Sequence, residues 1–262
     1  MEQQGLARIL HLRGVPFLKA LLEIEEQRFS DSQFLKGSTF EEINISFGLF
    51  PAARAYPVYF AGDVTRPISK KIFVGINPGY SSSPRQIAEQ KYLEQQGSFD
   101  GYCRIFSDFF ALHEKGLLPY FANIGGFLRR YSGIHQRIDW NWFQDNVISL
   151  DLIPYHSQNA AGLQIRDPKI FREVYFEILL RILEHLDPRE PIFFHGFPTV
   201  VKYLEQPVFR GAIDFQKRHA FWLGTFNKKF KFIGLPFLTR VAGGKDALVA
   251  QIKRSEGIQR DH

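Results

Sequence analysis

The residues best suited to chemistry form a short polar loop directly after an apolar run. The run occupies residues 72–76, and the loop continues as Asn77, Pro78, Gly79 and Tyr80, followed by three serines, Ser81, Ser82 and Ser83. The run predicts a buried strand, and the Asn-Pro-Gly cluster predicts a sharp loop at its carboxyl end. Pro78 fixes its own φ and keeps Asn77 extended, which would hold the Asn77 amide rigidly. Ligands of open α/β sheets bind beyond the carboxyl ends of strands, although an ordinary turn fits the same residues.

Composition indicates an ordinary globular protein of one large or two small domains. The chain has 262 residues, of which 45% are hydrophobic and 23% charged. No apolar run approaches the ~18 to 20 residues of a membrane helix, and the polar start lacks the pattern of a signal peptide. The single cysteine, Cys103, excludes an intrachain disulfide framework and a four-cysteine metal site, so a cytoplasmic setting is the default. The net charge of +6 suits a polyanionic partner such as nucleic acid, but many basic proteins bind none.

Apolar strands alternate with helices along most of the chain, which predicts a mostly parallel sheet covered by helices on both faces. The strand beginning at Ile72 is followed by others near residues 146–153, 191–196 and 229–233. Pro57 restricts residues 56–63 to an edge strand. We expect helices at 1–29 (broken at 14–16), 84–96, 101–112, 168–186, 197–205 and 244–255, and a loop-rich insertion at 113–145. The four strand ends carry Gly, Pro or polar clusters and should line one crevice.

Four motifs in this order resemble those of the uracil-DNA glycosylase superfamily, most closely its mismatch-specific thymine/uracil branch. Residues 75–79 (Gly-Ile-Asn-Pro-Gly) are similar to its first catalytic motif, and Leu238-Thr239-Arg240 to its second. The strand ending at Asp151 resembles its base-reading strand, and Phe106 lies where the family places a base-stacking aromatic. The resemblance covers residues 70–255 and implies a three-layer αβα fold with a central, mostly parallel four-stranded sheet. We therefore expect an N-terminal helical extension (1–65), a glycosylase-like domain (66–255) and a polar tail (256–262).

The resemblance also implies a role for each motif. Asn77 would hold the attacking water, and Phe106 would stack on the extruded base. Leu238 would be an apolar wedge that fills the vacated position in the DNA stack. The substrate-binding residues would be Gly75, Ile76, Pro78, Gly79, Tyr80, Phe106 and Asp151, and the DNA-binding residues would be Ser81, Ser82, Ser83, Leu238, Thr239 and Arg240.

Two positions depart from the family pattern. Where the second motif has a catalytic His or Asn, this chain has Gly234, so His156, His195 or His219 would have to replace it. We take His156 as the candidate, although none of the three has a spacing argument. At the base-reading position the chain has Asp151 where uracil readers have Asn. An ionised Asp only accepts hydrogen bonds, which suits a base with an exocyclic amino group such as cytosine. A helix or loop cap would also account for Asp151.

The sequence thus predicts a monofunctional DNA glycosylase for a damaged, mismatched or modified base. Water is the nucleophile, so no cofactor or metal is expected. The partner would be double- or single-stranded DNA, the chain would act as a monomer away from membranes, and either repair or defence against foreign DNA would fit. The alternative is a non-catalytic module that binds modified nucleic acid. A nucleotide hydrolase is a weaker third reading because the loop lacks the Lys-Ser/Thr ending of a P-loop.

Overall fold

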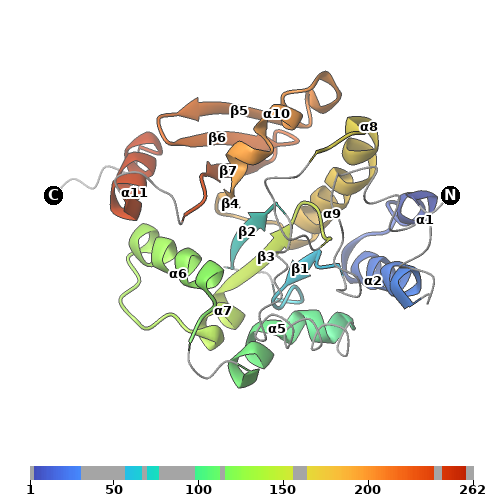
Figure 1. The fold of residues 1–262 in the computed structure, drawn as a ribbon, viewed down its shortest axis with the longest axis horizontal. Coiled ribbons are helices and arrows are strands. Elements are labelled where there is room, and N and C mark those ends of the chain that lie inside the picture. The colour runs from blue at the N-terminus through green and yellow to red at the C-terminus, as the bar shows by residue number, and fades with distance from the viewer. Residues whose placement is uncertain are drawn as a thin grey trace.

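A single mixed sheet forms the centre of the protein. The structure is a computed structural model, which describes residues 3–30, 57–66, 70–76, 98–112, 116–155, 164–238 and 244–257. Across those ranges seven strands form one sheet in the order β1-β3-β2-β4-β7-β6-β5 (Figure 1). The strands are β1 (Phe60–Ala61), β2 (Lys71–Gly75), β3 (Val147–Asp151), β4 (Ile192–His195), β5 (Ile213–Arg218), β6 (Phe221–Phe226) and β7 (Phe230–Leu235).

The four strands at the centre of this sheet run parallel. β2 pairs with β3 on one side and β4 on the other, and β4 pairs with β7. β1 is an antiparallel edge strand beside β3, and β6 and β5 extend the sheet antiparallel beyond β7. Because parallel neighbours end at the same edge, the carboxyl ends of β2, β3, β4 and β7 lie together.

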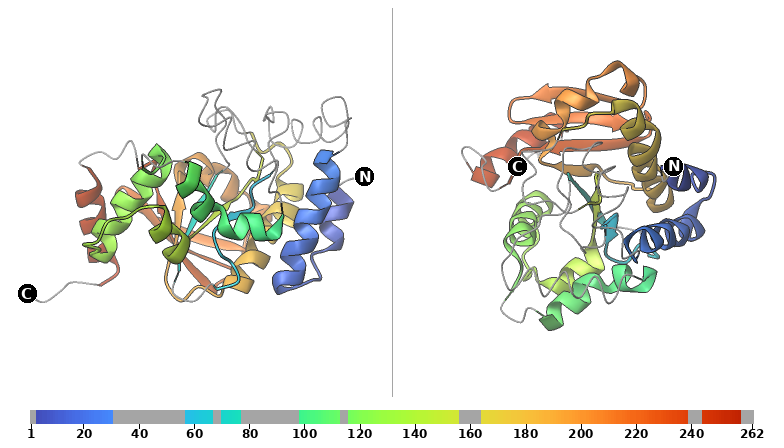
Figure 2. Two further views of the ribbon diagram at one scale, coloured as in Figure 1. Left: turned by 90° about the horizontal axis from the view of Figure 1, so that it is seen from below. Right: turned by 45° about the vertical axis from the view of Figure 1, so that its right-hand side comes forward.

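Helices flank the sheet on both sides (Figures 1 and 2). α5 (Phe99–Leu112), α6 (Pro119–Ser132) and α7 (Trp140–Asn146) lie on one side, with α11 (Gly244–Ser255) beside α6. The other side carries a continuous helical stretch: α8 (Pro168–Ile170), a π-helical turn η2 (Phe171–Phe176) and α9 (Glu177–Leu186). The short helices η3 (Phe197–Thr199), α10 (Val201–Leu204) and η4 (Pro207–Phe209) follow β4, and the N-terminal helices are α1 (Gln3–Arg8) and α2 (Gly14–Ser30).

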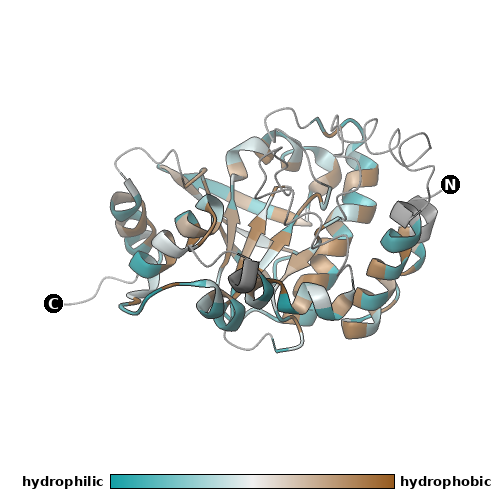
Figure 3. Ribbon diagram, turned by 60° about the horizontal axis from the view of Figure 1, so that its bottom comes forward, coloured by the Kyte–Doolittle hydropathy of each residue, from teal (hydrophilic) through white to brown (hydrophobic). Residues whose placement is uncertain are grey.

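Aromatic side chains fill the space between sheet and helices on both faces. Towards α6, Phe73 of β2 and Phe193 of β4 stack at 5.0 Å, and Phe127 contacts both rings. Towards η2, Phe176 contacts Phe226 at 5.7 Å. Residues one apart on a strand point to opposite faces, so a continuous run such as that in β4 serves both layers. Figure 3 shows these strands as the hydrophobic centre, with polar residues on the outer surfaces of the helices.

A buried carboxyl connects α2 to the edge of the sheet. Glu25 is 1% exposed and accepts hydrogen bonds from the hydroxyls of Tyr59 (2.6 Å) and Tyr155 (3.2 Å). The Tyr155 hydroxyl also bonds to that of Tyr175 in η2, at 3.2 Å. Burial, with Glu25 nearby, raises the pKa of Tyr59 well above its usual value, so its hydroxyl remains a donor. This cluster of Glu25, Tyr59, Tyr155 and Tyr175 joins α2, the approach to β1, the exit from β3 and η2.

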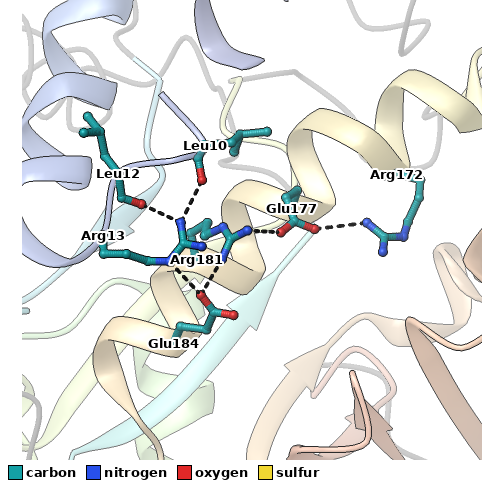
Figure 4. Close-up of polar contacts among 7 residues, drawn as sticks. All are labelled: Leu10, Leu12, Arg13, Arg172, Glu177, Arg181 and Glu184. Atoms are coloured by element: carbon teal, nitrogen blue, oxygen red, sulfur yellow. Dashed lines mark hydrogen bonds and ion pairs between the residues drawn. The ribbon is translucent and has the colours of Figure 1, made fainter. Parts of the chain in front are cut away.

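Ion pairs hold the α1–α2 junction against α9 (Figure 4). The Arg181 guanidinium contacts Glu177 at 3.0 Å and Glu184 at 2.8 Å. Arg13 pairs with Glu184 at 3.7 Å and donates to the carbonyls of Leu10 and Leu12, while Arg172 pairs with Glu177 at 3.2 Å. Arg181 is partly shielded from solvent, so these contacts form a network rather than isolated surface pairs.

The α/β class expected from the sequence is confirmed, but the sheet is mixed and larger than the expected four-stranded one. The antiparallel β5–β6 hairpin was not expected, and residues 113–145 contain the full-length helix α6 rather than only loops and short helices. The expected N-terminal extension contributes β1 to the sheet, where Phe60 pairs with Leu150. The helix expected at 84–96 lies outside the described residues. None of the described helices has the length and apolar character needed to cross a membrane.

The Glu25 cluster predicts a specific loss of stability. Glu25→Ala leaves buried tyrosine hydroxyls without their acceptor, so we expect the free energy of unfolding to fall by about 1–3 kcal/mol. Glu26→Ala, at an exposed position on the same helix, is the matched control and should change it by less than about 0.5 kcal/mol. Urea denaturation of both variants measures the difference, and equal stabilities would contradict the role assigned to the cluster.

Candidate functional site

The candidate site lies at the carboxyl ends of β3, β2 and β4, which are adjacent in the sheet. The last residues of these strands are Asp151, Gly75 and His195. Gly75 pairs with Asp151, and Val74 pairs with Phe194, which places His195 level with Gly75. Three strands therefore bring a backbone without a side chain, a carboxyl and an imidazole to one edge.

Gly75 allows the neighbouring side chains to approach its backbone. A Cβ atom at this position would lie 2.5 Å from Oδ1 of Asp151 and 3.3 Å from the hydroxyl oxygen of Tyr120. The first distance is too short for any real side chain, so Gly75 is needed for close approach rather than for an unusual φ. Asp151 and Tyr120 consequently lie together over the end of β2.

Tyr120 comes from the first turn of α6, where Pro119 begins the helix. Ser149 lies beside its hydroxyl, and burial, with Asp151 nearby, raises the tyrosine pKa. Ser149 is 6% exposed and precedes Asp151 by two residues, so both point to the same face of β3. The α6 face of the site thus presents neutral hydroxyls next to the carboxyl.

Asp151 has intermediate exposure at the end of β3. Within the described ranges its carboxyl has no hydrogen-bond or ion-pair partner, while its backbone N–H donates to the carbonyl of Tyr59 at 3.3 Å. Desolvation raises the pKa of Asp151 to about 8, because burial disfavours the charged form. At neutral pH the side chain is therefore mainly an un-ionised carboxylic acid.

His195 is a neutral imidazole at the end of β4, on the far side of β2 from Asp151. It is 6% exposed, and its Nε2 accepts a hydrogen bond from the backbone N–H of Leu238 at 3.0 Å, so Nδ1 carries the proton. Its ring lies edge-on to Tyr120 at 5.3 Å and to Phe237 at 5.4 Å. Burial lowers the pKa of His195 to about 4, so it stays uncharged at neutral pH.

Gly196 follows β4 directly and forms the turn into η3 beside the site. It has φ of 76°, a left-handed conformation that suits glycine. A Cβ here would meet Ile76 and Phe237 at 2.9 Å each. Ile76 and the half-buried Phe237 therefore pack directly over the turn, and Phe237 supplies an aromatic ring next to His195.

Part of the site expected from the sequence assembles in the structure. Gly75, Ile76 and Asp151 lie together, and Gly75 and Ile76 lead directly towards Asn77. The other expected residues of the first motif and of the DNA contact lie outside the described residues, as does His156: Asn77, Pro78, Gly79, Tyr80, Ser81, Ser82, Ser83, Thr239 and Arg240.

Two expected roles do not fit the structure. Phe106 is fully buried among Phe121, Trp140 and Phe143, so its ring has no free face for a base. It also lies near the amino end of β3, because a Cβ on Gly62 would contact both Phe106 and the carbonyl of Val147. Leu238 is 2% exposed and therefore does not project as a wedge.

Gly234 lies inside β7 and not among the residues of the candidate site. It pairs with Phe194 and Trp222, and a Cβ there would come within 2.8 Å of the Phe197 ring. A His or Asn at this position would collide with that ring rather than reach a substrate. His219 lies in the β5–β6 turn and is exposed, which leaves His195 as the histidine that the described structure brings to the site.

The sequence did not identify Tyr120, Ser149 or Phe237 as site residues, and it offered His195 as one of three candidate histidines. The available signal for His195, as for Asp151, was its position at the end of an apolar strand, and Phe237 follows such a strand closely. Tyr120 had no such signal, because its contact with Ser149 depends on how α6 packs. Among the described residues, no three His, Cys, Asp or Glu side chains cluster closely enough to hold a metal ion.

A scan against protein-family models finds no match for this chain, and a search of curated proteins finds none similar to it.

Packing around Gly234 predicts that it cannot be exchanged for the family's residue. Gly234→Ala should lower the free energy of unfolding by about 1–3 kcal/mol because Phe197 must move, and Gly234→His should prevent normal folding. Gly126→Ala on α6, where the nearest described atom is 3.7 Å away, is the control and should be neutral or slightly stabilising. Thermal unfolding distinguishes them, and a stable Gly234→His variant would contradict this account.

His195 predicts a pH-dependent contribution to stability. Its pKa of about 4 lies below the usual value, so the unfolded chain binds more protons between the two pKa values and stability falls on acidification. His195→Phe leaves the Leu238 N–H unpaired and should cost about 1–3 kcal/mol at neutral pH. That cost should shrink by up to ~1.4 kcal/mol per unit as the pH falls through the window.

His195→Gln, which keeps an acceptor, should recover part of the loss at neutral pH. Urea titrations of the three proteins at several pH values measure the difference. A cost of His195→Phe that does not vary with pH would show that folding leaves the pKa of His195 at its usual value, which would contradict the lowered pKa.

Proposed function

We propose that this chain is a DNA glycosylase, a divergent relative of the uracil-DNA glycosylase superfamily, that extrudes a damaged, mismatched or modified base and hydrolyses its N-glycosidic bond. The observation that carries the proposal is the edge where β3, β2 and β4 end, with the Asp151 carboxyl over the Gly75 backbone and no partner for it among the described residues. The chain continues from Gly75 and Ile76 into Asn77-Pro78-Gly79, and this sequence resembles the first motif of the superfamily. The central parallel strands and their helical layers suit the three-layer fold that the resemblance implies.

The residues at this edge of the sheet have the chemistry needed to bind a flipped base. Glycosylases read the edge of the base by hydrogen bonds and pack its faces against aromatic or apolar groups. Asp151 and Tyr120 offer polar groups, while Ile76 and the half-buried Phe237 offer apolar surface. Phe237 or Tyr120 therefore takes the stacking role that Phe106 cannot have.

The proposed reaction needs only water as co-reactant. The bond between C1′ of the sugar and the base nitrogen breaks, with its electron pair leaving on the base. The water oxygen bonds to C1′, and one water proton is transferred overall to the departing base. Fixed dipoles around the base stabilise the negative charge that develops on it, and Asn77 would orient the water. A net charge of +6 favours association with the DNA backbone.

A base-release screen tests the proposal. Duplex and single-stranded oligonucleotides, each with one uracil, mismatched thymine, cytosine or modified cytosine, are incubated with the protein. Free base is then read by mass spectrometry and abasic sites by alkaline cleavage. We expect release of at least one base, and Asn77→Ala should reduce its rate at least about a hundredfold.

Asn141→Ala, at an exposed position on α7, is the matched control and should retain the wild-type rate. Release that is equal in the wild type and Asn77→Ala would count against the Asn77 role. The complete absence of release from every substrate would defeat the enzymatic proposal.

A non-catalytic module for modified nucleic acid is the second candidate. It is favoured by Gly234, which has no side chain and is enclosed by Phe197, and by His195, whose Nε2 is already engaged by Leu238. Tight, salt-sensitive binding to one modified oligonucleotide without base release would support the module over the enzyme.

A further inference from the structure

The strongest unexplained feature is that the Asp151 carboxyl has no partner in the described structure. Buried carboxylates are normally paired or accept several hydrogen bonds, because an isolated buried charge is costly. Asp151 instead faces the Gly75 backbone on β2, with the Tyr120 hydroxyl nearby. Among the described residues the carboxyl therefore has no hydrogen-bond or ion-pair partner, and the residue keeps intermediate exposure.

The described elements around Asp151 supply no charge to hold an ionised carboxylate. The titratable groups that they bring to the site are neutral ones, Tyr120 from α6 and His195 from β4. Tyr120 has a raised pKa, and the pKa of His195 is lowered to about 4 by burial. On the β2 side, Gly75 ends the strand at this level and Ile76 follows it. No described Lys or Arg forms an ion pair with Asp151.

We propose that Asp151 meets the extruded base as an un-ionised carboxylic acid, donating one hydrogen bond and accepting another. This inference rests on the proposed glycosylase function and names the class of base edge that it reads. The matching edge presents a donor beside an acceptor. In cytosine these are the exocyclic amino group and N3, and in uracil or thymine they are the N3–H and a carbonyl oxygen.

This reading revises the preference expected from the sequence alone. An ionised Asp would accept only and so favour amino-bearing bases, whereas the acid has the donor and acceptor of an Asn amide. Asp151 in its acid form can therefore occupy the place of the family's Asn for both pyrimidine classes. Its pKa of about 8 means that the donor is lost in mildly alkaline solution, which an Asn would not show.

The protonation state can be measured without any enzymatic assay. Infrared difference spectra of the free wild-type protein and Asp151→Asn, recorded at about pH 6 and about pH 10, isolate the carboxyl. We expect the C=O band of a protonated acid at the lower pH only, lost in Asp151→Asn and unchanged in Asp145→Asn, an exposed control on α7. A carboxylate band for Asp151 at the lower pH would overturn the inference.

The second arm uses whichever oligonucleotide the base-release screen identifies. At about pH 6 Asp151→Asn should stay within about threefold of the wild type, because both side chains donate and accept. Above the carboxyl pKa the ratio of wild-type to Asp151→Asn rate should fall about tenfold per pH unit. Taking the ratio cancels groups that titrate in both proteins.

The outcomes of the two arms separate the two proposals. A rate ratio that stays constant across this pH range would overturn the role of the acid in reading the base, even if base release is observed. If no base is released but the infrared band is present, the glycosylase proposal fails while the protonated acid stands, and pH-dependent oligonucleotide binding then tests its role in recognition.

Discussion

The contact between the Asp151 carboxyl and the Gly75 backbone determines the character of the site. In a parallel pair, side chains at matched positions point to the same face, so a side chain at residue 75 would occupy the space of the carboxyl. Because residue 75 has no side chain, Tyr120 of α6 can approach the end of β2, and Asp151 is shielded from much of the solvent. The raised pKa, the neutral neighbours and the open donor–acceptor pair all follow from this packing.

Elements with strong local patterns could be predicted from the sequence. The apolar runs of β2, β3 and β4 end in glycine or polar residues, and α11 has the expected boundaries. The β5–β6 hairpin was missed because β5 alternates apolar and polar residues and β6 is interrupted by Gly224, so neither forms a continuous apolar run. A two-residue turn at His219 and Ala220 also lacks the usual glycine.

The site was only partly predictable, for a different physical reason. Asp151 was recognisable because its position depends on one strand, but the partners around it come from other segments. Phe106 and Leu238 show the converse error. An aromatic or leucine on an apolar face has the same local pattern whether it contacts a ligand or the core, and here both are buried. Gly234 stands where the sequence departs from the superfamily that it resembles, and in the structure this position is tightly packed within β7.

The Glu25 cluster has a consequence for how the chain folds. Glu25 bonds to Tyr59 and Tyr155, which are 34 and 130 residues away in sequence. α2, which carries Glu25, is synthesised early and Tyr59 follows it before β1, but Tyr155 is made only after β3. Because contacts of high sequence separation are slow to form, the bond between Glu25 and Tyr155 makes the packing of α2 depend on a segment more than a hundred residues later in the chain.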